Sequence, residues 1–306
     1  MGARPAQVPA SGRSIPLGIG LMCLAVSSFA VTDATAKWLG QHISVFMVVW
    51  ARYAVHFAVS FAVFNPWTVP GLLRTTRPGL QLTRSALLFA VTVFNFTALR
   101  FLQLDQTVSI MFSAPFFVAL FAGPLLGEWV GARHWAVILV GFAGILLVVR
   151  PGAGGIHPAA LLSLGAAATY ALYAITTRML AAHDRSETTL FYSALVGTVA
   201  ASLPLPLVWE TPREPVVIGG MLSLGIIAGA GHFLLILAHA RAPAATLSPY
   251  LYTQIVGMVL LGWLVFDQTP TLWTLAGAGL VIASGIYLLL HERRERGRGP
   301  RPDTAG

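Results

Sequence analysis

The chain has 306 residues, of which 56% are hydrophobic and only 10% are charged, and its mean hydropathy is +0.76. Soluble domains carry about 25% charged residues, so this composition excludes an ordinary soluble protein. The net charge of +8 does not indicate nucleic-acid binding, because the arginines lie between apolar runs and in the C-terminal tail. The composition predicts an all-α membrane protein.

Ten apolar segments follow one another along the chain. Each is close to the length of about 20 residues that a helix needs to cross the hydrocarbon layer, and turn residues separate them. The predicted spans are 15–36, 43–64, 82–101, 106–126, 133–149, 157–181, 188–209, 216–238, 243–266 and 271–290. Residues 1–14 and 291–306 are polar and rich in Pro, Gly and Arg, so we expect a disordered N-terminus and a basic, disordered tail.

The second half of the chain repeats the first. Residues 98–147 resemble residues 237–286, with Thr107 matching Thr246 and Gly123 matching Gly262. The predicted repeats are 15–150 and 151–290, with five spans each. An odd number of spans inserts the second copy upside down relative to the first. Ten transmembrane helices in two inverted five-helix repeats are the architecture of a secondary transporter, whose substrate binds between the halves.

Lysine and arginine predict the orientation of these spans. Most of the 19 basic residues fall on one side of the membrane when the N-terminus is placed in the cytoplasm. Because cytoplasmic loops carry the excess of Lys and Arg, both termini are expected in the cytoplasm and the protein in the inner membrane.

Two pairs of polar residues lie four positions apart inside predicted spans. Asp33 and Lys37 are in the first span, and Arg52 and His56 are in the second. Such residues share a helix face, and intramembrane charges are costly unless partnered. Either Asp33 and Lys37 form an ion pair near the outer interface, or Asp33 couples transport to protons. Arg52 either pairs with Asp33 or holds a substrate carboxylate.

The predicted fourth span carries polar and aromatic side chains on one face. Ser109, Phe112, Ser113 and Phe116 have the spacing i, i+3, i+4 and i+7 of a continuous helix. Donors beside rings suit a small solute with one apolar side, although packing and interhelical hydrogen bonds explain the same residues. The candidate substrate-binding residues are Asn95, Ser109, Phe112, Ser113, Phe116, His232, Tyr252 and Gln254.

Enzymatic signatures are missing from the sequence. It contains no phosphate-binding loop, no zinc-protease motif, no nucleophile elbow and no Cys/His metal cluster. The single cysteine, Cys23, has no partner for an intramolecular disulfide. We therefore expect no catalytic residue, metal or cofactor. A membrane-embedded lipid-handling enzyme or a structural subunit remains the alternative from another class.

The segment around the end of the fourth span resembles a known family. Ser113-Ala114-Pro115-Phe116 followed by Gly127-Glu128 is similar to the EamA-type members of the drug/metabolite transporter superfamily. The second half departs from the pattern, with Phe266-Asp267 in place of Gly-Glu and Gln254 in place of the proline. The resemblance covers residues 15–290.

The resemblance implies a central cavity lined by spans three, four, eight and nine. It also implies export of amino acids, aromatic and other neutral ones, across the inner membrane by alternating access. The partners would be amino acids or related metabolites and the lipid bilayer, with a monomer as the functional unit. A multidrug, nucleotide-sugar or other metabolite carrier of the same fold is the alternative within the class.

Overall fold

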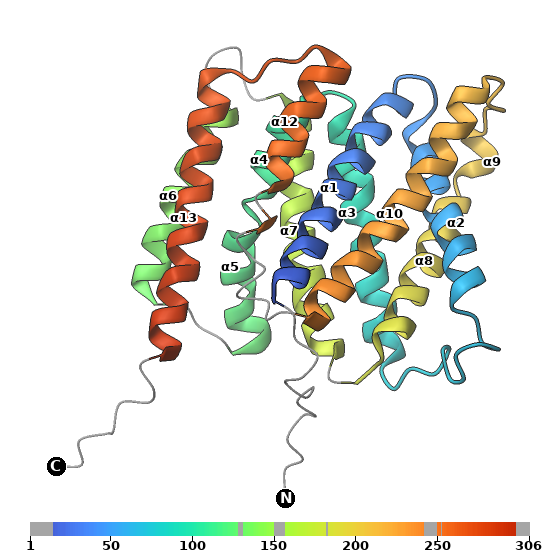
Figure 1. Ribbon diagram of the computed structural model, residues 1–306, viewed down its shortest axis with the longest axis horizontal. Coiled ribbons are helices and arrows are strands. Elements are labelled where there is room, and N and C mark those ends of the chain that lie inside the picture. The colour runs from blue at the N-terminus through green and yellow to red at the C-terminus, as the bar shows by residue number, and fades with distance from the viewer. Residues whose placement is uncertain are drawn as a thin grey trace, which may run out of the picture.

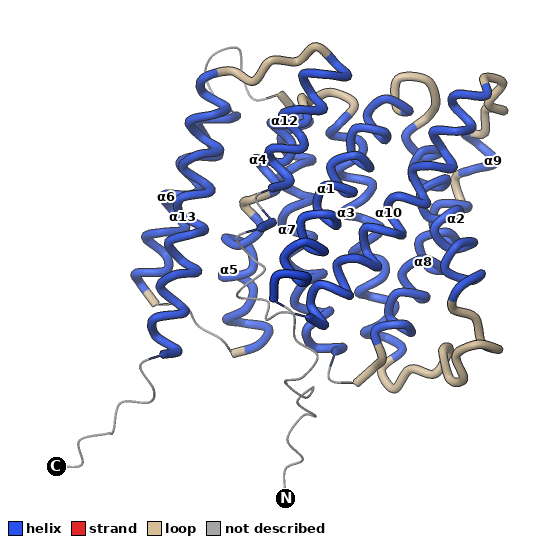
Figure 2. The backbone as a smooth tube through the Cα atoms, viewed as in Figure 1, coloured by secondary structure: helices blue, strands red, loops and turns tan. Residues whose placement is uncertain are grey.

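The computed structural model describes residues 15–127, 131–149, 157–181, 183–241, 250–251 and 253–297, and within these ranges all regular structure is helical (Figure 2). The helices stand side by side in one bundle (Figure 1). In chain order they are α1 (Ile15–Leu39), α2 (Val45–Val63), α3 (Pro78–Leu99), α4 (Leu104–Met111), α5 (Ala114–Leu126), α6 (Ala132–Val149), α7 (Pro158–Ala181), α8 (Ser186–Ser202), α9 (Leu205–Val208), α10 (Pro215–Arg241), α12 (Thr253–Phe266) and α13 (Leu272–Gly297).

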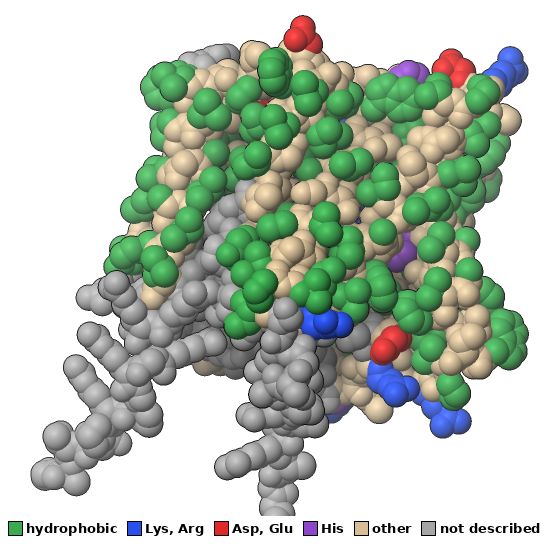
Figure 3. All heavy atoms as spheres, viewed as in Figure 1, with side chains coloured by type: hydrophobic (Ala, Val, Ile, Leu, Met, Phe, Trp, Pro, Cys, Tyr) green, Lys and Arg blue, Asp and Glu red, His purple; other side chains and the backbone are tan. Residues whose placement is uncertain are grey.

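Six helical segments of the described chain are long and apolar enough to cross a membrane. They are Ile15–Leu39, Val45–Val63, Pro78–Leu99, Leu104–Leu125, Pro158–Thr177 and Pro215–Leu235. Trp135–Val148, Thr253–Phe266 and Leu272–Ser284 are shorter apolar helices. Hydrophobic side chains cover much of the visible face of the bundle, and charged side chains gather at its two ends (Figure 3). This surface suits a protein whose sides contact lipid.

The predicted fourth span is broken in the middle. α4 ends at Met111 and α5 begins at Ala114, so residues 112 and 113 belong to neither helix. Pro115 lies in the first turn of α5, where its missing N–H costs nothing, whereas inside a continuous helix it would remove a hydrogen bond. The expectation that Ser109, Phe112, Ser113 and Phe116 lie on one continuous helix face is therefore wrong.

Other predicted boundaries differ at the ends of spans. Pro204 separates α8 from the single turn of α9, which shortens the predicted span 188–209. α13 continues to Gly297, so the first residues of the predicted tail are helical rather than disordered. Residues 242–249, at the start of the predicted ninth span, lie outside the described residues.

Helices from the two ends of the chain pack against each other throughout the bundle. The most extensive pairs are α1 with α10, α6 with α13 and α3 with α7, and α2 packs on both α8 and α10. Glycines allow the closest of these approaches. A Cβ added at Gly144 in α6 would lie 2.7 Å from the backbone oxygen of Gly277 in α13. The folded core is therefore shared between the two sequence repeats.

Candidate substrate site

Polar side chains from four helices meet inside the bundle. Asp33 comes from α1, Arg52 and His56 from α2, Asn95 from α3 and His232 from α10. We call these five residues the polar cluster. Arg52 is 7% exposed and His56 is 3% exposed, while the other three are half-buried. The cluster therefore reaches from the packed interior to partly accessible space, and both ends of the chain contribute to it.

Asp33 is held by Asn95 on the neighbouring helix. Nδ2 of Asn95 donates to Oδ1 of Asp33 at 3.0 Å. Arg52 lies close enough for its positive charge to act on this carboxylate. No direct ion pair joins Asp33 and Arg52, although the structure describes both residues. The bond between Asp33 and Asn95 links α1 to α3 and leaves the other carboxylate oxygen free for a ligand.

Only part of the Arg52 guanidinium is hydrogen-bonded. Its Nη2 lies 3.4 Å from Nε2 of His232, and its guanidinium stacks over the ring of Tyr53, 4.6 Å from the centroid. Within the described residues, Nη1 is buried without a hydrogen-bond partner. The contact with His232 requires that Nε2 of the imidazole accept the bond, so the histidine is neutral with its proton on Nδ1. One face of the guanidinium is thus packed and one N–H group remains unused.

Two rings, those of Phe29 and His56, lie beside the ring of His232. The rings of His56 and His232 are parallel, 6.0 Å apart between centroids and 2° apart in plane, and Phe29 lies 5.0 Å from His232. Gly229 in α10 makes room for His56, because a Cβ there would lie 3.0 Å from Cδ2 of the His56 ring. Both ring nitrogens of His56 are buried without a partner in the described part of the chain. Gly229 thus lets the His56 ring pack closely against α10.

The predicted ion pair between Asp33 and Lys37 is not formed. Nζ of Lys37 donates instead to the backbone oxygens of Leu99 at 2.8 Å and Leu102 at 2.6 Å, at the end of α3. Carbonyls in the last turn of a helix have no partner within the helix and attract cations. Lys37 is also 5% exposed, so it does not reach up to the membrane surface. It stabilises a helix end rather than neutralising Asp33.

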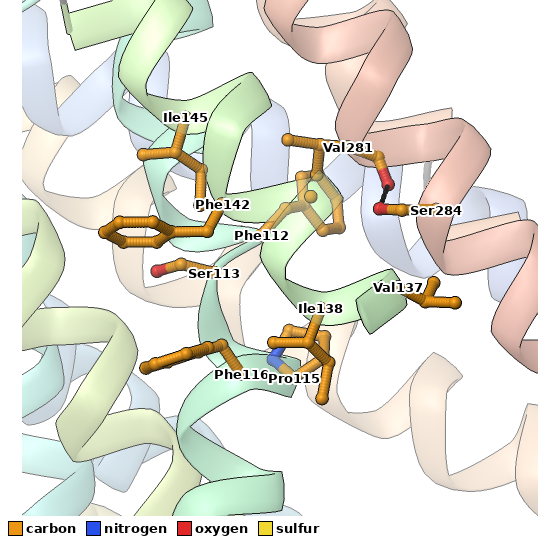
Figure 4. Close-up of a pocket in the computed structure, with 11 residues that line it drawn as sticks. Phe112, Ser113, Pro115, Phe116, Val137, Ile138, Phe142, Ile145, Val281 and Ser284 are labelled. Carbon is orange, nitrogen blue, oxygen red and sulfur yellow. Dashed lines mark hydrogen bonds between the residues drawn. The ribbon is translucent and has the colours of Figure 1, made fainter. Parts of the chain in front are cut away.

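Several predicted site residues lie elsewhere, around a small cavity between the α4–α5 break, α6 and α13. Phe112, Ser113 and Phe116 line it together with Phe142 and Ser284, and it encloses about 40 Å³ (Figure 4). A water needs about 10–15 Å³ in this measure, so the cavity has room for a few waters and not for a metabolite. The rings of Phe116 and Phe142 stack at 5.6 Å, which is ordinary core packing.

The remaining predicted residues do not join the polar cluster in the described structure. Ser109 is fully buried and donates to the backbone oxygen of Asp105 at 2.6 Å, within its own helix. Gln254 lies at the start of α12 and is half-buried. Tyr252 lies outside the described residues. Of the eight residues predicted to bind substrate, Asn95 and His232 are therefore the two that the structure brings together with Asp33, Arg52 and His56.

Sequence reasoning missed a second buried arginine. Arg84 was not among the candidate residues, yet it is 6% exposed inside the bundle. Its guanidinium donates to Oγ1 of Thr177 at 2.8 Å, Oγ of Ser193 at 2.6 Å and Oη of Tyr173 at 2.8 Å. These partners come from α7 and α8. The sequence feature that could have indicated its burial is the position of Arg84 within the apolar run 82–101, where a surface arginine is unexpected.

Apolar helices with a polar cluster buried between them define a helical membrane transporter. The model of the EamA-like transporter family matches residues 16–150 and again residues 157–290. The chain belongs to the EamA-like transporter family and contains its unit twice. This confirms the family resemblance seen in the sequence.

Three relatives match along nearly their whole length. An S-adenosylmethionine uptake transporter of Rickettsia bellii is 27% identical, covering 92% of this chain and 96% of its own. A riboflavin transporter of Rhizobium johnstonii is 30% identical, covering 90% and 92%. The pseudopaline exporter CntI of Pseudomonas aeruginosa is 26% identical, covering 89% and 95%. All three are transporters, which agrees with the expectation of a protein that is not an enzyme. None is an amino-acid exporter, so these relatives do not support that branch.

A solved crystal structure shares the fold. It superposes with a TM-score of 0.64 over 94% of this chain and 99% of its own, at 19% sequence identity. At this identity the likeness concerns the fold alone.

Proposed function

We propose that this protein is a secondary carrier for a small polar metabolite in the class represented by S-adenosylmethionine and riboflavin. The observation that supports it most is the match to S-adenosylmethionine and riboflavin transporters over at least 90% of this chain. This favours the metabolite-carrier alternative over export of amino acids. The polar cluster supports it too, since it combines a cation, a carboxylate, an amide and two imidazole rings, with Phe29 beside them.

The proposed topology is ten transmembrane spans in two inverted repeats. The packing of the helices supports it, because the contacts occur in matched pairs. α1 packs on α10 as α7 packs on α3, and α1 packs on α12 as α7 packs on α5. This is the pattern expected when a two-fold axis relates α1 to α7, α3 to α10 and α5 to α12. α6 with α13, and α2 with α8, pair across that axis.

The ends of the bundle agree with termini on one side of the membrane. α1 begins and α13 ends toward the same end of the bundle, the lower one in Figure 1. An even number of spans produces this arrangement. In the proposal that side is the cytoplasm, the membrane is the bacterial inner membrane, and a single chain is the functional unit.

Transport in this proposal occurs by alternating access around the polar cluster. Asp33, Arg52, His56 and Asn95 come from the first repeat and His232 from the second. Carriers built from inverted repeats bind substrate at the repeat interface and open it to each side in turn. A rocking movement of α10 against α2 would change the Arg52–His232 contact and expose the site.

The test is uptake by purified protein in liposomes. The panel contains labelled S-adenosylmethionine, riboflavin and several amino acids, each measured with and without a pH gradient, and protein-free liposomes are the control. Saturable uptake of S-adenosylmethionine or riboflavin is the expected result. Saturable uptake of amino acids alone would overturn the proposal in favour of the amino-acid carrier. No flux of any solute from protein shown to be folded would favour a structural or lipid-handling role.

A further inference from the structure

Two groups of opposite charge, Asp33 and Arg52, lie within electrostatic range of each other in the polar cluster and form no direct ion pair. Asp33 is engaged by Asn95 at 3.0 Å, and Arg52 contacts a neutral imidazole at 3.4 Å. A buried charge is costly unless a partner of opposite sign and good hydrogen bonds compensate for it. Ionisable residues inside membrane spans are rare and usually mark substrate or ion pathways. The arrangement therefore has the features of a site prepared for a ligand.

The unused donor belongs to the most buried charged group of the cluster. Among the residues that the structure describes, Nη1 of Arg52 lacks a hydrogen-bond partner, and only 7% of this side chain is exposed. Cζ of Arg52 also lies 4.6 Å from the centroid of the Tyr53 ring, within reach of a cation–π contact. A planar guanidinium with free N–H groups matches the two oxygens of a carboxylate. His232 occupies Nη2 in this structure and would be the group displaced.

We propose that the polar cluster recognises the α-amino carboxylate group of the transported metabolite, with Arg52 binding its carboxylate and Asp33 binding its ammonium. The inference rests on the carrier function proposed above and narrows its substrates. The carboxylate and the ammonium of such a group are separated by one carbon, so they need a cation and an anion on adjacent elements. α1 and α2 supply this pair through Asp33 and Arg52.

The rings beside this charge pair complete the match. Phe29 and His232 lie 5.0 Å apart, and His232 is parallel to His56. When the site opens, the faces of these rings would be positioned for a heteroaromatic ring of the substrate to stack on. S-adenosylmethionine and free amino acids share the α-amino carboxylate, whereas riboflavin has neither a carboxylate nor an amine. The inference therefore favours S-adenosylmethionine or an amino acid over riboflavin.

The experiment measures competition against labelled S-adenosylmethionine, or against a labelled amino acid if that is the solute transported, on the full chain in nanodiscs. The competitors are S-adenosylmethionine, its decarboxylated form, methionine and 5′-methylthioadenosine. The last keeps the adenosine and lacks the carboxylate, the ammonium and the sulfonium charge. The wild-type protein is expected to bind the complete compound about tenfold or more tightly than the decarboxylated one, because a charge-assisted hydrogen bond is lost. Equal affinities would overturn the inference without any variant.

Variants assign the preference to residues. Arg52→Gln is expected to abolish the preference for the carboxylate while leaving the affinity for 5′-methylthioadenosine unchanged. Arg74→Gln is the control, because it removes an exposed arginine outside the polar cluster, and the carboxylate preference should persist. If Arg52→Gln does not fold, Arg52→Lys keeps the charge and should retain part of the preference. Loss of affinity for every competitor alike would assign Arg52 a purely structural role and refute the inference.

The two proposals fail in different ways. Uptake of riboflavin but not of S-adenosylmethionine or amino acids would leave the metabolite carrier standing and refute recognition of an α-amino carboxylate. Methionine competing as well as S-adenosylmethionine would keep the inference and identify the amino-acid group as the main determinant. 5′-Methylthioadenosine competing as well as S-adenosylmethionine would show that the adenosine carries the affinity, against the inference.

Discussion

Replacing Arg84 by methionine tests whether a buried guanidinium connects α3 to α7 and α8. The substitution keeps an unbranched apolar stem and removes three side-chain hydrogen bonds, at 2.6–2.8 Å, to Ser193, Thr177 and Tyr173. It also removes the stacking of the guanidinium 4.7 Å from the Tyr173 ring centroid. The reasoning predicts a loss of stability, because these contacts hold three helices together.

The expected loss is about 2–4 kcal/mol. Side-chain hydrogen bonds in membrane proteins contribute about 0.6 kcal/mol on average and at most about 1.7, so three of them give about 2 kcal/mol at the average and about 5 at the maximum. A cation–π contact adds about 0.5–2 kcal/mol. Removing a buried charge recovers some desolvation energy, and this gain offsets the cation–π term. In the variant, Ser193 still donates to the backbone oxygen of Thr189, and Thr177 still donates to that of Tyr173. These bonds limit the free-energy cost of removing the arginine from the two hydroxyl groups.

The assay is reversible unfolding in mixed micelles, followed by the loss of helical signal. Arg74→Met is the matched control, because Arg74 is exposed and surface substitutions usually change stability by less than about 0.5 kcal/mol. The single variant Ser193→Ala should lose about 0.6–1.7 kcal/mol of its own. If Arg84→Met unfolds within about 0.5 kcal/mol of wild type, these bonds do not hold the three helices together, and the buried network is wrong.

Three further predictions concern charge and packing. Asp33→Asn should slow both pH-driven uptake and solute exchange if Asp33 binds the substrate ammonium; loss of the pH response with exchange intact would instead assign it to proton coupling. Lys37→Met should destabilise the fold by about 1–3 kcal/mol, because it leaves two carbonyls at the end of α3 unpaired; unchanged unfolding would contradict this. Gly144→Val should destabilise by about 1–3 kcal/mol, since its side chain would collide with the Gly277 backbone of α13; this is measured against Gly20→Ala, whose Cβ meets nothing within 4 Å.

Much of the fold was predictable because the bilayer restricts what a chain can do. A run such as 15–36 has to be a helix in lipid, since only a helix satisfies all its backbone groups, and α1 spans Ile15–Leu39. The span boundaries that were predicted wrongly depend on local backbone chemistry. Pro115 and Pro204 each allow a break that hydropathy does not register, because apolar side chains continue across it.

The candidate site was predictable only in its residue types. Polar residues inside apolar runs are costly, so Asp33, Arg52 and Asn95 were identifiable as residues with a purpose. The residues that contact them could not be identified from the sequence. Asp33 and Lys37 lie four residues apart on one helix, which favours a local ion pair. In the structure, Asp33 instead accepts a hydrogen bond from Asn95 on a different helix. Lys37 finds helix-end carbonyls that no sequence pattern marks.

The polar and aromatic residues of the predicted fourth span also show what the sequence could not predict. Phe112, Ser113 and Phe116 still line one cavity, but that cavity faces α6 and α13. Spacing along the chain predicts which residues lie on one face and does not predict which helices that face meets.

The sequence by itself determined that this protein is a helical membrane transporter of duplicated design, because composition, span length and the internal repeat are properties of the chain read in order. Only the tertiary structure decided which polar groups meet. Contacts between α1, α2, α3 and α10 join residues as far apart as Phe29 and His232. Such contacts depend on how helices pack and on where a glycine such as Gly229 lets a ring approach. Packing geometry of this kind is a property of the folded bundle, and no local pattern encodes it.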